Sequence, residues 1–284
     1  MWCQMDNNLK LLIDRLEAER CLEKNEYKML IEGFSEEPAA YAASKADRIR
    51  QSIYGKDVYI RGLIEVSNIC ANDCLYCGIR KSNAQCARYR LPLETVLECC
   101  RKGYELGFRT FVMQGGEDGF FTAEHICRYV SSIKKIFPDC AVTLSLGEYS
   151  KEEYKAMYDA GADRYLLRHE TADKAHYEKL HPASMSFEKR MKCLENIKET
   201  GFQTGCGFMV GSPYQTSDTL AADLKFIEKF KPHMCGIGPF IPHKDTPFGS
   251  CPAGTAELTV YLLSLIRLIR PDILLPATTA LGTI

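Results

Sequence analysis

The sequence predicts an α/β protein in which parallel strands and helices alternate around a TIM-type barrel, preceded by a helical cap. Two observations support this fold class. From Arg61 onward, short apolar runs alternate with segments of helical periodicity, which is typical of repeated βα units. Polar or glycine-rich groups follow every apolar run, as they do where loops meet at the mouth of a barrel. The 284 residues, 46% of them hydrophobic, suffice for a full core.

The N-terminal segment is predicted to form charged amphipathic helices. Its apolar residues lie among acids and bases, at Leu9, Leu12, Ile13, Leu16, Met29, Leu30 and Ile31. We expect residues 1–54 to form a cap and residues 55–284 to form the barrel core.

Seven strands are predicted after the cap. They are residues 61–67, 109–114, 140–146, 163–168, 204–210, 233–238 and 272–278. The helices between them have recognisable ends. Pro92 suits a first helical position, and Ser150 with Glu153 forms a capping box. The other predicted N-caps are Thr122, Ser186 and Thr216, and the predicted helix ends are Gly107, Gly161 and Gly201.

The predicted barrel is truncated after its seventh strand. The chain stops at Thr283-Ile284, without the helix and strand that would complete eight βα units. Because an apolar strand at 273–277 would leave an unpaired edge beside the site, we expect a fragment that is poorly soluble.

Composition excludes several partners. Lys and Arg total 36 against 37 Asp and Glu, with no block of either charge, so we expect neither nucleic acid nor a membrane surface. No stretch reaches the ~20 apolar residues of a membrane span, and the N-terminus lacks a signal peptide. Fourteen cysteines in a chain of this length fit reduced thiols. The sequence therefore predicts a cytoplasmic protein that acts on small molecules.

The most specific motif is a cysteine loop after the first strand. Cys70, Cys74 and Cys77 place three thiolates within eight residues, with Tyr76 beside the third. A 4Fe-4S cluster has four irons, so three protein ligands would leave one iron open. The alternatives are a zinc site with a fourth ligand elsewhere, or cysteines that only pack. The spacing resembles the radical S-adenosylmethionine (SAM) superfamily, in which the open iron binds SAM and an electron cleaves it to a 5′-deoxyadenosyl radical.

Two further strand ends carry candidate cofactor contacts. Gly115, Gly116 and Glu117 resemble the superfamily's strand-two motif, which holds the methionine amino group of SAM, although a tight turn would also explain the glycines. We count Tyr76 with these cofactor-binding residues. Arg168 and Glu170 lie two apart at the fourth strand end, so both can face the barrel axis. There Arg168 can grip a carboxylate and Glu170 can accept from ribose hydroxyls, unless the two form a surface ion pair.

Four other residues have open assignments. Arg190 can reach the SAM carboxylate, pair with Glu170, or remain solvated. His169 should point away from the barrel axis, and His243 is either a ligand or a loop-packing residue. Cys206 lies on the fifth predicted strand, where it is either buried or exposed to the barrel interior.

Four segments together resemble the HydE family of FeFe-hydrogenase maturation enzymes. They are residues 143–148, 164–172, 236–243 and 276–280. The resemblance implies that Glu170 and Arg190 contact SAM. It also implies a pocket for a small anionic substrate, lined by Thr143, Arg168, Thr278 and Thr279. It also implies an iron carbonyl–cyanide cysteine complex as substrate, partner maturases, and ferredoxin or flavodoxin as electron donor. The alternatives are a radical SAM mutase or lyase similar to methylornithine synthase, and an iron–sulfur or zinc protein without catalysis.

Overall fold

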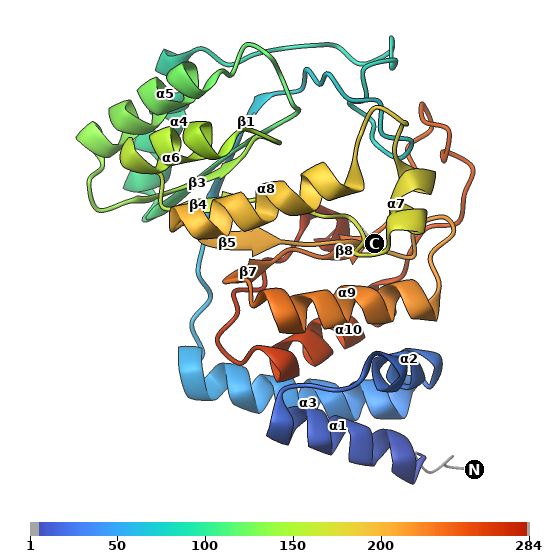
Figure 1. Cartoon of the computed structure of the whole chain (residues 1–284). Coiled ribbons are helices and arrows are strands. Elements are labelled where there is room, and N and C mark those ends of the chain that lie inside the picture. The colour runs from blue at the N-terminus through green and yellow to red at the C-terminus, as the bar shows by residue number, and fades with distance from the viewer. Residues whose placement is uncertain (1–5, 283–284) are drawn as a thin grey trace.

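The computed structural model describes residues 6–282. Within these residues, a six-stranded parallel sheet has the order β1-β2-β3-β4-β5-β7 (Figure 1). Its strands are β1 (Gly62–Ser67), β2 (Thr110–Gly115), β3 (Ala141–Ser145), β4 (Arg164–Leu166), β5 (Gln203–Cys206) and β7 (Met234–Cys235). A parallel pair, β6 (Met209–Val210) and β8 (Gly238–Pro239), continues from the ends of β5 and β7. This is the sheet of the predicted α/β barrel type, and all of its carboxyl ends meet on one side.

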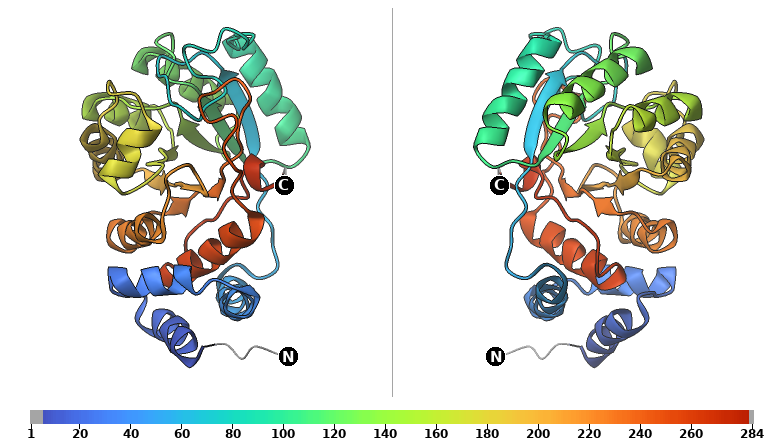
Figure 2. Two further views of the ribbon diagram at one scale, coloured as in Figure 1. Left: turned by 90° about the vertical axis from the view of Figure 1, so that its right-hand side faces the viewer. Right: turned by 90° about the vertical axis from the view of Figure 1, so that its left-hand side faces the viewer.

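Helices cover the outer face of the curved sheet (Figure 2). They are α4 (Leu93–Glu105), α5 (Ala123–Ile136), α6 (Lys151–Asp159), α7 (Lys174–Leu180), α8 (Phe187–Thr200), α9 (Ser217–Phe230) and α10 (Ala256–Ile269), followed by the short 3-10 helix η1 (Thr279–Gly282). The core between sheet and helices contains alternate strand residues such as Val142 and Leu144, both fully buried.

Most of the predicted helix ends are confirmed. Thr122, Ser150, Ser186 and Thr216 all accept a hydrogen bond from the backbone at the third helical position, and Ser150 and Glu153 form the capping box. Gly201 ends α8 in the left-handed conformation with φ of 107°. The exception is Pro92, which is the N-cap of α4 and not its first residue, because its ψ of 160° is extended.

The last three predicted strands are shorter than expected. Residues 204–210 and 233–238 each divide into two strands, because the backbones cross too closely at Gly207. A Cβ at this position would overlap the carbonyl oxygen of Gly236. Residues 272–278 form a single bridge, between Leu274 and Met234, and not a strand. A turn precedes this bridge, with Ile273 N bonded to Arg270 O, and Pro276 has no N–H to extend it.

The N-terminal helices α1 (Asn7–Glu19), α2 (Lys24–Glu32) and α3 (Glu36–Tyr54) pack on α9 and α10, at the opposite end of the molecule from the loop that follows β1 (Figure 1). Backbone carbonyls are part of this contact. Tyr261 donates to Leu30 O at 3.0 Å, and Arg20 donates to Leu268 O at 2.9 Å. The cap therefore shares one core with the barrel, and the boundary at residue 54 stays a prediction. Every helix within residues 6–282 is too short or too polar to cross a lipid bilayer.

Candidate active site

The cysteine loop lies at the carboxyl end of β1 and is anchored to its neighbours. Ala71 N donates to Glu117 O at 2.8 Å, which joins the loop to the end of β2. Leu75 N donates to Leu180 O at 3.0 Å, which joins it to the end of α7. Gly116 allows this approach, because a Cβ there would stand only 2.7 Å from the Cβ of Cys70. The glycine is therefore required by the cysteine loop itself.

The three predicted cluster cysteines lie close enough to influence one another. Burial, together with the neighbouring thiols of Cys77 and Cys70, raises the pKa of Cys74 to about 12. Burial also raises the pKa of Cys77. A metal centre that binds these cysteines must therefore release their protons. Within residues 6–282, no three ligand side chains converge on one metal ion.

Tyr76 is held by a buried histidine that follows α7. Its hydroxyl lies 3.1 Å from His181 Nε2, and His181 Nδ1 lies 2.9 Å from Tyr177 O. A carbonyl only accepts, so Nδ1 carries the proton and Nε2 accepts from Tyr76. Burial lowers the pKa of His181 to about 4, which keeps the ring neutral. Met185, further along the same connector, places its sulfur 3.6 Å from Cys74 Sγ.

The two acids after β2 have different environments. Asp118 receives two hydrogen bonds from Arg90, at 2.7 and 2.8 Å, and one from Ser67 at 2.7 Å. It is therefore a structural residue of the turn. Glu117 lies 3.2 Å from Arg190 Nη2, and burial raises its pKa. Asn72 also lowers the pKa of Glu117 through a side-chain hydrogen bond. A carboxylate that costs free energy to bury can exchange its ion-pair partner for a ligand.

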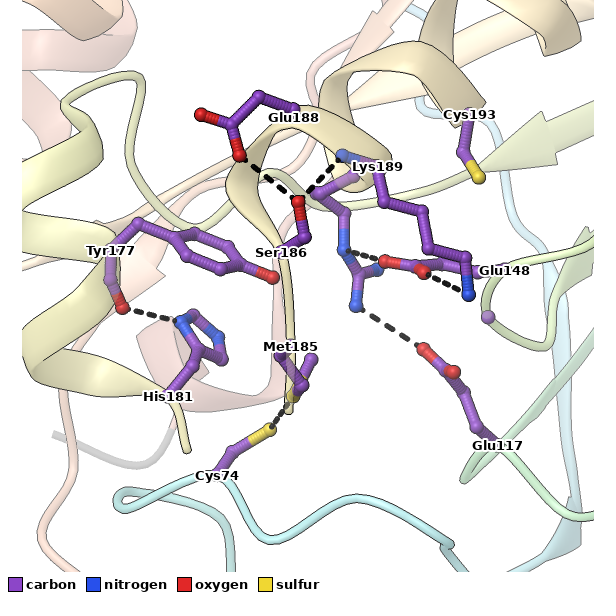
Figure 3. Close-up of polar contacts among 12 residues, drawn as sticks. Cys74, Glu117, Glu148, Tyr177, His181, Met185, Ser186, Glu188, Lys189 and Cys193 are labelled. Carbon is purple, nitrogen blue, oxygen red and sulfur yellow. Dashed lines mark hydrogen bonds and ion pairs between the residues drawn. The ribbon is translucent and has the colours of Figure 1, made fainter. Parts of the chain in front are cut away.

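Arg190 lies in the first turn of α8 and pairs with acids from two other loops. These acids, Glu117 and Glu148, are labelled in Figure 3. Arg190 Nε lies 2.8 Å from Glu148 Oε1 in an ion pair, and Arg190 Nη2 donates to Glu117 Oε1 at 3.2 Å. Burial opposes the charge of Arg190, but these carboxylates outweigh it and raise the pKa of the guanidinium. The expected alternative, a pair between Arg190 and Glu170, is replaced by these two contacts.

Arg168 and Glu170 do lie together at the end of β4. Arg168 Nη2 is 3.2 Å from Glu170 Oε2, but without the alignment of a hydrogen bond. Arg168 Nε and Nη2 and Glu170 Oε2 are therefore buried without a hydrogen-bond partner in the described chain. Thr143 on β3 likewise has a buried hydroxyl without a partner, and it alternates with core residues, so it faces the other side of the sheet. Unpaired buried polar atoms indicate a place for a ligand.

The C-terminal threonines lie beside β8. Thr278 donates to Ile237 O at 3.2 Å, and Thr279 begins η1. The structure also places His169 and Cys206, whose environments the sequence left open. His169 points away from Arg168 and Glu170, as expected: it is fully buried, with Nε2 3.3 Å from Asp223 Oδ1. Cys206 is fully buried in the core beside Cys235, its partner in the sheet register.

His243 packs against the cysteine loop. A Cβ at Gly78 would stand 2.7 Å from His243 Cδ2. Two important residues escaped the sequence analysis. His181 follows a helix without any motif, and no local signal identifies it. Glu148 stands after β3 with the same polar strand-end position as the other candidates, and that position was the available signal.

Comparison with known proteins identifies the family. Residues 64–227 match the model of the radical SAM superfamily. The "[FeFe] hydrogenase maturase subunit HydE" of Thermotoga maritima is 48% identical over 239 residues, which are 84% of this chain and 68% of that protein. The chain belongs to the HydE family. It is thus a radical SAM enzyme of hydrogenase maturation whose cofactors are a 4Fe-4S cluster and SAM.

More distant relatives have the same fold. The 3-methylornithine synthase of Methanosarcina acetivorans is 26% identical over 96% of this chain and 72% of its own length. The crystal structure of methylornithine synthase (PylB) matches this HydE-family chain with a TM-score of 0.85 at 24% identity, over 94% of this chain and 78% of that one. The maturase HydG from Carboxydothermus hydrogenoformans matches with a TM-score of 0.78 at 20% identity, over 97% and 67%. At this identity the likeness shows the barrel fold alone.

Proposed function

We propose that this chain holds the cluster through Cys70, Cys74 and Cys77 and acts on an iron carbonyl–cyanide cysteine complex during assembly of the FeFe-hydrogenase cofactor. The observation that carries the substrate proposal is the group of buried polar atoms without hydrogen-bond partners at Thr143, Arg168 and Glu170. Arg168 and Glu170 still form an ion pair at 3.2 Å. A buried guanidinium and hydroxyl without hydrogen-bond partners favour an anionic ligand that accepts hydrogen bonds.

Different residues around the cysteine loop bind different parts of SAM. When bound, the cluster and SAM together supply a 5′-deoxyadenosyl radical. Arg190 binds the carboxylate of the methionine moiety, and Glu117 with the backbone of Gly115 and Gly116 binds its amino group. Glu170 accepts from the ribose hydroxyls. Tyr76, fixed by His181, closes the side of the cofactor site that adjoins Cys77.

Arg168 and Thr143, with Thr278 and Thr279, hold the substrate carboxylate and exclude water from it. Arg168 supplies the charge, since its Nε and Nη2 donors are unused within the protein. A substrate fixed through its carboxylate presents its sulfur in one orientation, which is what radical addition at sulfur requires.

The chain has two kinds of protein partner in this proposal. One is the set of other hydrogenase maturases, which supply the complex and receive the product. The other is a low-potential donor, ferredoxin or flavodoxin, which reduces the cluster.

Electron paramagnetic resonance of the anaerobically reconstituted, reduced protein tests the cofactor part. We expect a 4Fe-4S signal that shifts when SAM is added, and loss of both the signal and SAM cleavage in C74A. A C251A variant, changed outside the cysteine loop, is the control and should retain both. Cleavage that persists in C74A would refute the cluster ligands.

Product analysis tests the substrate part. We expect 5′-deoxyadenosyl transfer to the sulfur of the complex in the wild type and not in R168A. A rearranged free amino acid as product would instead assign a mutase of the methylornithine synthase kind.

A further inference from the structure

Arg190 has two acidic partners that differ in their distance from the guanidinium and in the exposure of their side chains. Glu148 Oε1 lies 2.8 Å from the guanidinium Nε in an ion pair, and its side chain is 8% exposed. Glu117 accepts a hydrogen bond from Nη2 at 3.2 Å, and its side chain is 25% exposed. Opposite charges attract more strongly at a shorter distance and where water screens them less. Glu148 is therefore the stronger electrostatic partner of the two.

The backbone that carries Glu148 is fixed by two buried tyrosines. The carbonyl oxygen of Gly147 accepts from Tyr165 at 2.9 Å and from Tyr154 at 3.2 Å. Tyr154 also accepts from Tyr149 N at 3.1 Å, on the other side of Glu148. Both tyrosines are fully buried. Glu148 thus projects from a turn whose position does not depend on any ligand.

The second oxygen of Glu148 is also occupied, by an exposed residue. Lys189 Nζ lies 3.1 Å from Glu148 Oε2, beside the glutamate in Figure 3, but the lysine side chain is 68% exposed. Exposed ion pairs contribute little to stability. Lys189 therefore adds a second, exposed positive charge next to Glu148, while the ion pair between Glu148 and Arg190 is buried.

Glu117 is placed for exchange. Its backbone carbonyl contacts the cysteine loop through Ala71, so its side chain lies next to the proposed SAM site. A bound amino acid group carries one ammonium and one carboxylate. The ammonium can pair with Glu117 and the carboxylate with Arg190, which replaces one protein ion pair by two protein–ligand pairs. The exchange leaves the guanidinium in place only if another residue holds it.

We propose that Glu148 is a positioning residue that holds Arg190 through Nε, so that the rest of the guanidinium receives the carboxylate of the methionine moiety of SAM. This inference rests on the proposed function, in which SAM binds beside the cysteine loop. Glu148 itself does not touch the ligand. It acts by keeping Arg190 in one orientation before and after binding, which lowers the cost of ordering that side chain.

The test compares two ligands in the wild type and five variants by isothermal titration calorimetry under anaerobic conditions. SAM has the carboxylate, whereas 5′-methylthioadenosine has the same adenosine without any amino acid group. In E148A we expect SAM affinity to fall roughly tenfold to a hundredfold, as for other residues that orient a ligand-binding group. The affinity for 5′-methylthioadenosine should remain within about twofold of the wild type.

The other variants separate positioning from general damage. E148D keeps the carboxylate that pairs with Arg190, so it should restore part of the SAM affinity that E148A loses. K189A removes only the exposed partner and should bind like the wild type. In an R190A background, E148A should cause no further loss, because the two residues act as one unit.

The outcomes distinguish a failure of the positioning role of Glu148 from a failure of the proposed function. If wild-type protein binds SAM and E148A binds it equally well, or if E148A loses both ligands in parallel, the positioning role is wrong while the proposed function stands. If wild-type protein fails to bind SAM, the proposed function is wrong and this role falls with it.

Discussion

Gly147 lies directly against the side chain of Glu117, on the turn that follows β3. It has a φ of 98°, and a Cβ at this position would overlap Glu117 Cγ and stand 2.5 Å from Cδ. Glycine is thus required twice, for its backbone conformation and for the space that Glu117 occupies.

The first prediction separates these two requirements. Gly107 also has positive φ, 91°, but a Cβ there would meet nothing within 4 Å. We expect G147A and G107A each to lower the free energy of unfolding by about 1–2 kcal/mol through backbone strain. Only G147A should weaken SAM binding, since only there must Glu117 move. Equal SAM affinity in the two variants would contradict the placement of Glu117 in the cofactor site.

The second prediction concerns Thr143, whose buried hydroxyl has no partner. T143V removes a polar atom that is costly to bury, so we expect the free energy of unfolding to rise by up to about 1 kcal/mol while substrate turnover falls. Thr204 is the matched control, because it is fully buried and donates to Phe202 O at 3.1 Å. T204V should lose stability. Urea denaturation measures the free energy of unfolding of both variants, and product analysis measures turnover. A destabilised T143V with normal turnover would show that the hydroxyl serves the fold.

The third prediction is a pH dependence that arises from His169. Burial lowers its pKa to about 3, whereas an unfolded histidine binds its proton near pH 6.5. From pH 7 to pH 5 the unfolded state therefore gains a proton that the native state does not. Stability should fall by up to about 1.4 kcal/mol per pH unit from this histidine over the lower part of that range.

The variant H169N tests this slope in the apoprotein, with urea denaturation at each pH. Burial raises the pKa of Asp223, which contacts His169 and acts in the opposite direction, so both slopes are measured in a D223N background, where their difference isolates His169. Parallel slopes with and without H169N in that background would refute the prediction.

The fourth prediction concerns the hydrogen bond between Tyr76 and His181. Y76F leaves His181 Nε2 buried without a donor, which should cost about 1–3 kcal/mol of unfolding free energy. Because the cysteines are unchanged, the cluster signal in electron paramagnetic resonance should remain. Stability equal to that of the wild type would mean that this contact does not anchor the loop.

The sequence predicted the site better than it predicted the last strands. Cys70, Glu170 and their neighbours stand at strand ends, and parallel strands bring those ends together whatever the lengths of the strands are. The break after Cys206 has no local signal, because it arises from the close crossing of Gly207 and Gly236, which are far apart in the chain. The same limit applies to Arg190, whose partners come from two different loops.

Single strand-end residues were also harder to judge than motifs. Asp118 has the chemistry of a site residue, yet Arg90 and Ser67 satisfy it, and neither is near it in sequence. Glu148 has the same chemistry and does join the site. Only the identity of the distant partner separates these two acids.

The packing of α1–α3 on α9 and α10 determines the order in which the chain can complete its core. Leu12, Ile13 and Leu16 belong to a hydrophobic core that also contains Leu262 and Leu265, about 250 positions later. On the ribosome α1–α3 are made long before α9 and α10, so their apolar faces stay exposed until those later helices emerge. These three helices are thus synthesised early but buried late.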